Sequence, residues 1–236
     1  MFSNNLLMAA GGGADASLPV ITDTLLAHYR ADLGVTKDES NLVSVWADQS
    51  DNGYDLLQDT AGDLPTWVAS GIGGKNTIRG DGTGTFMNAV FTKAQPYHLF
   101  VIINQISWSG SPTSVIVGGI INDTHPAFIQ RTSSPQIQQN AGTATGNAIS
   151  PALGVDSLIH GYWSGANSYL VLDTGAQQGA TNPGTIGITA LTVFGKDDSH
   201  YANVDIAEIC LYATEVDGDD LTTLQDYFNL RYTLGF

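Results

Sequence analysis

The chain has 236 residues, of which 42 % are apolar and only 13 % are charged. Its formal net charge is -15, from 23 acidic and 8 basic side chains, which argues against nucleic-acid binding and against attraction to anionic membranes. Cys210 is the single cysteine, so the chain cannot form an internal disulfide framework.

Residues 1–17 are predicted to form a flexible attachment arm, in which a small apolar anchor precedes the glycine-rich stretch GGGADAS. The apolar piece from Leu6 to Ala10 is too short for the core of a signal peptide or for a membrane span. We therefore expect a protein made in a cytoplasm and not inserted in a membrane. The anchor residues are Phe2, Leu6, Leu7 and Met8.

From Pro19 onward, short runs of β-branched and aromatic residues alternate with turn signals, a pattern typical of an all-β domain. The long apolar run from Tyr97 to Trp108 predicts a central strand that is covered on both faces. The other predicted strands lie in the stretches TLLAHYRA, LVSVW, TWVAS, NTIRG, TSVIVGGII, AFIQR, SLIHGYW, SYLVLDTG, LTVFG and ANVDIAEICLYAT.

The stretch from Glu215 to Phe236 is the one segment with helical periodicity. Its acidic residues crowd the first turn, where the helix dipole favours negative charge, and Gly235 is a suitable stop. The apolar stripe is Leu221, Leu224 and Phe228, with Arg231 at the same spacing, and the acidic residues are Asp217, Asp219 and Asp220. Residues 18–236 are thus predicted to form one all-β domain, a two-sheet antiparallel jelly-roll sandwich with one short C-terminal helix.

The stretch VWADQSDNGYDLLQD contains a D-x-S-x-N-G run that is close to the start of a twelve-residue calcium loop. The predicted strand NLVSVW before it, where a calcium loop would have a helix, favours a structural turn, and the twelfth position carries Asp59, which is one methylene shorter than the usual glutamate. Three carboxylates nevertheless crowd the loop, so calcium is the one cofactor that the sequence admits. The candidate metal ligands are Asp48, Asp51 and Asp55.

Several stretches resemble the concanavalin A-like lectin/glucanase superfamily, in its laminin-G-like jelly-roll branch. The specific pieces are W-x-D-x-S-x-N-G, the G-D-G turn in NTIRGDGTGTFM, and VDIAEICLYATEVDGDDLTTLQDYFNLRYTLG, a strand that leads into a short helix. The resemblance covers nearly everything after residue 18. It implies the jelly-roll fold, and modules of this branch occur in bacterial surface proteins and in bacteriophage virions.

The glucanases of this superfamily use acids in an E-x-D-x-x-E or E-x-D-x-E strand, and no such string is present. The nearest pair is Asp205 and Glu208, whose separation of three predicts opposite faces of a strand. Nothing in the sequence indicates a Tyr/His/Arg cluster on one concave face either, and the five histidines show no zinc-ligand spacing. His28 and His98 are predicted to be packed inside strands. We therefore expect no glycoside hydrolysis.

Sugar binding is predicted at two places where a tryptophan stands beside a turn, because an aromatic ring stacks on a sugar while amides and carboxylates bond its hydroxyls. The alternative is that these aromatic rings cap the core. The candidates are Trp108 with Asn104 and Gln105, and Trp163 with Asn167 and Tyr169.

Together with the resemblance, these features lead us to expect a non-enzymatic phage virion protein, such as a head decoration, head fibre or tail fibre protein. Its lectin-like domain would bind host-surface carbohydrate, and its arm would attach it to other virion proteins or within a homotrimer, assembled in the host cytoplasm. Two alternatives stay open: a polysaccharide-acting enzyme (hydrolase or lyase), or a bacterial surface adhesion domain.

Overall fold

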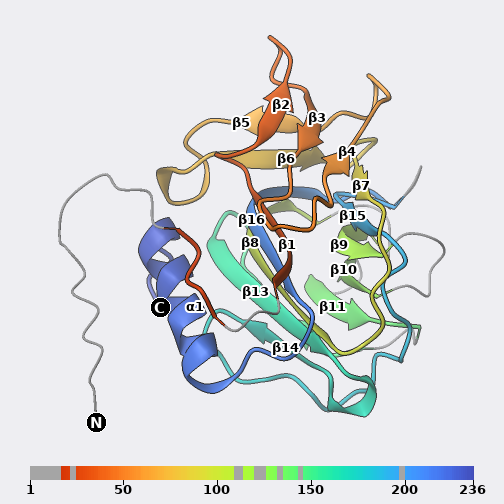
Figure 1. The fold of residues 1–236 in the computed structure, drawn as a ribbon, viewed down its shortest axis with the longest axis vertical. Coiled ribbons are helices and arrows are strands. Elements are labelled where there is room, and N and C mark those ends of the chain that lie inside the picture. The colour runs from red at the N-terminus through yellow and green to blue at the C-terminus, as the bar shows by residue number, and fades with distance from the viewer. Residues whose placement is uncertain are drawn as a thin grey trace.

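The computed structural model describes residues 17–21, 25–108, 114–119, 126–131, 135–142, 146–196 and 200–236. The predicted attachment arm, with Phe2, Leu6, Leu7 and Met8, lies outside these residues. Within them the chain forms two antiparallel sheets and one α-helix (Figure 1), so the predicted two-sheet sandwich with a C-terminal helix is confirmed. No helix in the described part of the chain is long and apolar enough to span a bilayer.

The first sheet has seven strands and the second has nine. In order across the first sheet the strands are β14 (Tyr169–Leu172), β13 (Asp156–Trp163), β8 (Tyr97–Ser107), β16 (Asn203–Tyr212), β6 (Thr77–Asp81) and β5 (Thr66–Val68), and β1 (Leu25–Arg30) also pairs with β16. In the second sheet they are β12 (Ala148–Ile149), β11 (Gln136–Asn140), β10 (Ala127–Arg131), β9 (Ser114–Gly119), β15 (Leu191–Val193), β7 (Met87–Ala89), β4 (Leu56–Leu57), β3 (Val43–Trp46) and β2 (Val35–Lys37). Two short 3-10 helices, η1 (Ile72–Gly74) and η2 (Gly165–Asn167), complete the elements.

The main core lies between the two sheets, where alternate side chains of each strand meet. Its largest members include Trp46, Phe128 and Trp163, and Tyr97 stacks on Trp163 with ring centroids 5.2 Å apart. β8 and β16 are buried on both faces, as their nearly continuous apolar sequences predict.

A second core lies on the outer face of the seven-stranded sheet, which helix α1 (Gly218–Tyr232) covers (Figure 1). Leu224 and Phe228 pack there against Phe100 of β8, as the predicted apolar stripe requires. The helix ends at Tyr232, three residues before the expected stop at Gly235, because Thr233 already adopts the left-handed conformation, with φ of 55°. The buried face is also wider than predicted, since it includes the polar side chains Tyr227, Arg231 and Tyr232.

β16 is the central strand of the seven-stranded sheet and pairs with three neighbours. β8 runs along one edge, while the other edge is divided between β6, at residues 203–206, and β1, at residues 208–212. The strand thus joins elements from distant parts of the sequence.

A β-bulge in β16 changes which side chains face outward. Ile206 is opposite Ile103 and Glu208 is opposite Ile102, so Ala207 is an extra residue on this strand. Ile206 and Ile209 point into the core between the sheets, whereas Ala207 and Cys210 pack on the outer face under α1. Because of the extra residue, Asp205 and Glu208 share the outer face. The expectation that they lie on opposite faces is therefore wrong.

Candidate functional site

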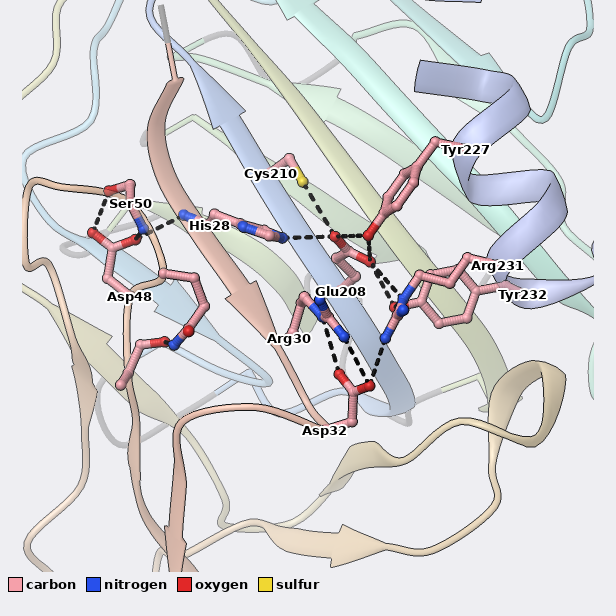
Figure 2. A network of polar contacts seen from close by, with 12 residues as sticks. His28, Arg30, Asp32, Asp48, Ser50, Glu208, Cys210, Tyr227, Arg231 and Tyr232 are labelled. Carbon is pink, nitrogen blue, oxygen red and sulfur yellow. Dashed lines mark hydrogen bonds and ion pairs between the residues drawn. The ribbon is translucent and has the colours of Figure 1, made fainter. Parts of the chain in front are cut away.

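The carboxylate of Glu208 is the centre of a buried polar network that joins β16, β1 and α1 (Figure 2). The Tyr232 hydroxyl donates to Oε2 at 2.6 Å, and the Tyr227 hydroxyl lies 3.0 Å from Oε1 and 3.2 Å from Oε2. His28 Nε2 lies 2.6 Å from Oε1 and donates to it. Strand β1 presents His28 outward because its alternate residues, Ala27 and Tyr29, enter the main core. Glu208, with an exposure of 0 %, is thus held by three donors from two other elements.

Asp32 extends the network by bridging two arginines. Arg30 donates to its Oδ1 from Nε at 3.1 Å and to its Oδ2 from Nη2 at 3.0 Å, and Arg231 Nη2 donates to Oδ2 at 2.5 Å. Arg231 Nε also donates to the Tyr232 hydroxyl at 3.2 Å and lies 3.5 Å from Glu208 Oε2. Two carboxylates therefore face two guanidinium groups, which balances the buried charge.

The surroundings of Glu208 keep the neighbouring acidic groups protonated. Burial, together with the charge of Glu208, raises the pKa values of Tyr227 and Tyr232 well above the ordinary value for tyrosine. Burial and the same carboxylate also raise the pKa of Cys210, whose Sγ lies 3.8 Å from Oε1. The tyrosines act as hydrogen-bond donors, and Cys210 is a thiol rather than a thiolate nucleophile.

His28, Glu208 and Cys210 are the one group of potential metal ligands that the described residues bring together, with ligand atoms within 4.8 Å of one another. Two ligands of a tetrahedral zinc ion would stand roughly 3.3 Å apart, given metal–ligand bonds of about 2.0–2.1 Å. The 2.6 Å between His28 Nε2 and Glu208 Oε1 is instead a hydrogen-bond distance. This geometry favours a hydrogen-bonded network over a metal site.

A cleft of about 650 Å³ opens beside this network, and His28 and Arg30 belong to both. Most of its other polar side chains come from the loop after β3. The cleft is lined by Ser17, Leu18, Pro19, Val20, Ile21, Leu25, His28, Arg30, Leu33, Gln49, Ser50, Asp51, Asn52 and Tyr212. It is an open space with hydrogen-bonding side chains on its walls, next to a charged and buried cluster.

In the first predicted sugar-binding group, Asn104 and Gln105 lie in β8 and Trp108 follows directly after it, and each side chain has different contacts. Asn104 donates from Nδ2 to Asp156 Oδ1 at 2.6 Å, while Gln105 is fully buried and donates to the Ser107 carbonyl at 2.6 Å. Trp108 is half-buried and packs against the main core. None of the three side chains lines the cleft.

The second predicted group is divided between the two faces of the seven-stranded sheet. Trp163 is only 1 % exposed, lies in the main core, and donates from Nε1 to the Asn140 carbonyl at 2.9 Å. Tyr169 packs against Tyr162 in a separate cluster, and Asn167 is exposed in η2. The structure therefore does not bring these residues together around one ligand.

The loop with the predicted metal ligands is closed by hydrogen bonds to Asp48. Its Oδ1 accepts from the His28 and Ser50 amides at 2.8 and 2.9 Å, and its Oδ2 accepts from the Ser50 hydroxyl and the Tyr54 amide at 2.7 and 3.0 Å. Asp55 Oδ1 accepts from the Asp48 amide at 2.9 Å, and Asp51 is exposed. The bonds to Asp48 and Asp55 are those of a structural turn.

Replacing Asp48 by alanine should lower the free energy of unfolding by about 1–3 kcal/mol, because partly buried amides lose their acceptor. The cost should be the same with a chelator and with added calcium, as measured by urea unfolding. Asp51→Ala is the matched control, and its effect should stay within about 0.5 kcal/mol, as for an exposed side chain. A cost for Asp48→Ala that appears only with calcium would identify Asp48 as a cation ligand.

Sequence reasoning missed the Glu208 network, although one signal pointed to it. Arg231 continues the helical spacing of Leu224 and Phe228, so a charged side chain falls on the apolar face of the helix. Such a residue needs a buried partner. The structure brings Tyr227, Tyr232, His28, Arg30 and Arg231 together around Glu208 and Asp32, in a network whose members are largely buried.

No protein-family model matches the chain, and no curated protein is similar to it in sequence. Solved structures do share its fold. The Trypanosoma rangeli sialidase in complex with the inhibitor DANA matches with a TM-score of 0.60 and 14 % identity over 89 % of this chain and 33 % of the sialidase. The chain thus spans about a third of that enzyme.

Two further structures match with similar TM-scores. A mutant GH54 α-L-arabinofuranosidase, soaked with 4-nitrophenyl α-L-arabinofuranoside, has a TM-score of 0.63 at 13 % identity, over 81 % of this chain and 51 % of its own. Domain 4 of AbnA, a GH43 extracellular arabinanase from Geobacillus stearothermophilus, in complex with arabinotriose, has a TM-score of 0.61 at 11 % identity, over 86 % of this chain and 98 % of its own.

These comparisons contradict the expectation of a non-enzymatic phage virion protein. The structures named above come from glycoside hydrolases, and none of them is a phage protein. These neighbours support the alternative, a polysaccharide-acting enzyme, better than the expectation of no enzyme and no hydrolysis. At 11–14 % identity the similarity establishes the fold alone: the two-sheet β-sandwich of this chain matches part of each of these structures.

Proposed function

We propose that this chain is a sugar-binding β-sandwich of a polysaccharide-acting enzyme. The observation that carries the proposal is the cleft of about 650 Å³, whose walls hold amide, carboxylate, hydroxyl and imidazole groups. A cavity of this size with a few polar groups on its walls suits a short oligosaccharide. The adjoining Glu208 network holds the β1 side of the cleft in place.

The comparisons support this proposal through the extent of the match. The chain covers 98 % of an arabinanase domain that was solved with arabinotriose, but only 33 % of the sialidase. It therefore corresponds in size to one domain of a larger glycoside hydrolase. We also propose that the sandwich is of the laminin-G-like type, and this part of the proposal rests on the W-x-D-x-S-x-N-G stretch.

The two carboxylates on the outer face of β16 are each held by hydrogen bonds from other side chains. Glycoside hydrolysis generally needs two carboxyl groups, spaced about 5–5.5 Å apart in retaining enzymes and about 6.5–9.5 Å apart in inverting ones. On the neighbouring strand β8, Asp205 pairs with Asn104 and Glu208 pairs with Ile102. These two partners are two residues apart, so the two acidic residues lie roughly 7 Å apart along the strand. Asp205 is held by Arg79 through two bonds of 2.7 Å, and Glu208 is buried beneath α1. We assign Asp205 to holding β6 on β16, and Glu208 to holding β1 beside the cleft.

Calorimetric titration with arabinotriose tests the proposal, with cellotriose and xylotriose as comparison ligands. We expect saturable binding of at least one of these sugars, with a dissociation constant below about 1 mM, equivalent to about 4 kcal/mol. A reducing-end assay on arabinan, run in parallel, measures whether the chain also cleaves polysaccharide. If the chain neither binds nor cleaves any of these sugars, the proposed function is contradicted.

A further inference from the structure

Strand β1 lies at an edge of the seven-stranded sheet, because among the described strands it pairs with β16 alone. The Ala31 amide, just after the strand, donates to the Ala207 carbonyl of β16 at 2.9 Å. Successive residues of an antiparallel strand direct their backbone groups to opposite sides, so those of His28 and Arg30 point away from β16. A row of such groups at the edge of a sheet is a template on which another strand can add.

The loop after β3 occupies the His28 backbone on this free side of β1. Asp48 Oδ1 accepts from the His28 amide at 2.8 Å (Figure 2), and the Gln49 amide donates to the His28 carbonyl at 2.7 Å. Asp48 is itself fixed, since its carboxylate also accepts from Ser50 and from the Tyr54 amide. The loop thus makes the pair of bonds that a neighbouring strand would make to His28.

The carbonyls on either side of His28 along the free edge are occupied as well. The Ser50 hydroxyl and the Asn52 side-chain amide donate to the Leu26 carbonyl at 3.3 and 3.0 Å. The Leu33 amide donates to the Arg30 carbonyl at 3.1 Å. The acceptors on the free side of β1 are therefore bonded by donors from the same chain.

A second copy of this chain is the partner that the uncapped edge would fit. The amide and the carbonyl of His28 point to the same side, so a two-fold axis beside this residue would pair each His28 amide with the His28 carbonyl of the other copy. The loop also brings two carboxylates, Asp48 and the exposed Asp51, to this edge. In such a dimer they would repel their counterparts, a device that protects strand edges from pairing.

We infer that residues 48–52 form a cap that keeps two copies of this chain from joining their seven-stranded sheets through β1. The alternate side chains of the D-x-S-x-N run, Asp48, Ser50 and Asn52, each bond the backbone of β1, which gives this sequence pattern a role. Sugar binding plays no part in this role, so the cap stands or falls independently of the proposed function.

Hydrogen exchange of the His28 amide, followed by NMR, tests whether the loop is the cap. Asp48→Ala removes the acceptor of this amide, so we expect its protection to fall by at least about tenfold. The Ala31 amide, which bonds β16, should lose less protection. Asp51→Ala is the matched control, because it removes the same charge from the same loop but none of these bonds. Unchanged protection of the His28 amide in Asp48→Ala would overturn the cap.

Sedimentation velocity over a range of protein concentrations tests the role of the cap. The triple variant Asp48→Ala/Ser50→Ala/Asn52→Ala should associate with a dissociation constant at least about tenfold lower than that of the original chain or of Asp51→Ala. The His28 amide of the triple variant should become protected again as dimers form. Thermal melting checks the fold, and Asp48→Ala is measured in the same way if the triple variant does not fold. Association no stronger than that of the original chain, or association that leaves the His28 amide unprotected, would refute pairing through β1.

Discussion

Replacing Glu208 by alanine should cost about 3–5 kcal/mol in the free energy of unfolding, a large part of the stability of a typical domain. The change removes the shared acceptor of His28, Tyr227 and Tyr232, all of which are buried. It also removes a carboxylate 3.5 Å from Arg231 Nε, and Arg231 is buried. Denaturant unfolding monitored by tryptophan fluorescence gives the cost directly.

Two further variants separate the role of the charge from that of the side-chain volume. Glu208→Gln keeps the size but presents an amide, which can accept fewer bonds from these donors, so we expect a smaller loss than for alanine. Glu39→Ala removes an exposed glutamate and should change stability by less than about 0.5 kcal/mol. If Glu208→Ala unfolds within about 1 kcal/mol of the original chain, the network does not hold β1 and α1 to the sheet.

Acidification from pH 6.5 to pH 4 should remove about 3 kcal/mol of stability through His160 alone. Burial lowers its pKa from 6.5 to about 4. In this window the unfolded chain binds a proton that the folded chain excludes, so stability falls as the pH falls and levels off below the folded pKa. Burial and the neighbouring ring of His160 also lower the pKa of His98, which adds to the effect.

Hydrogen bonds fix the tautomers of these two buried rings. The Val216 amide donates to His98 Nδ1 at 3.2 Å, so neutral His98 carries its proton on Nε2 and donates to His160 Nδ1 at 3.0 Å. The proton of His160 is then on Nε2, which is buried without a partner among the described residues. A second proton on either ring would have to break one of the two bonds.

Urea unfolding at pH 7.5, 6, 5 and 4 measures this effect, with His160→Gln as the control. The amide oxygen of glutamine can accept from His98 but does not titrate, so the variant should show a shallower dependence on pH. Hydrogen bonds from Thr83, Gly84 and Thr85 outweigh burial and lower the pKa of Asp81 to about 2, so its contribution is lost only below about pH 4. A flat profile between pH 6.5 and 4 would show that the histidine pair does not control acid stability.

The sandwich could be predicted from sequence because its determinants are local. Strand after strand shows β-branched residues between turns, and the single helix has apolar residues at helical spacing with acids in its first turn. The predicted burial of His28 and His98 inside strands is confirmed for the same reason. The end of the helix was less predictable, since Thr233 takes up a conformation that glycine usually adopts.

The candidate site could not be predicted because its determinants are distant in the sequence. His28 and Glu208 are 180 residues apart, and only the pairing of β1 with β16 brings them together. The bulge at Ala207 has no signature in the sequence, yet it decides the face on which Glu208 lies. The predicted tryptophans fail as a guide for a related reason: an aromatic residue beside a turn has the same sequence pattern whether it is exposed or, like Trp163, buried.

The divided edge of β16 has a consequence for the order in which the protein can fold during synthesis. Among the described strands, β1 pairs with β16 alone, and β6 pairs with β16 and with the short β5. A ribosome that adds about 5–20 residues per second needs roughly 10–40 s to travel from Arg30 to Tyr212. Throughout that interval β1 has no strand partner, and the outward side chains of β8 have no helix to cover them. The nascent chain therefore exposes unpaired edges until nearly all of the domain has left the ribosome, which makes this period the one in which a chaperone is most needed.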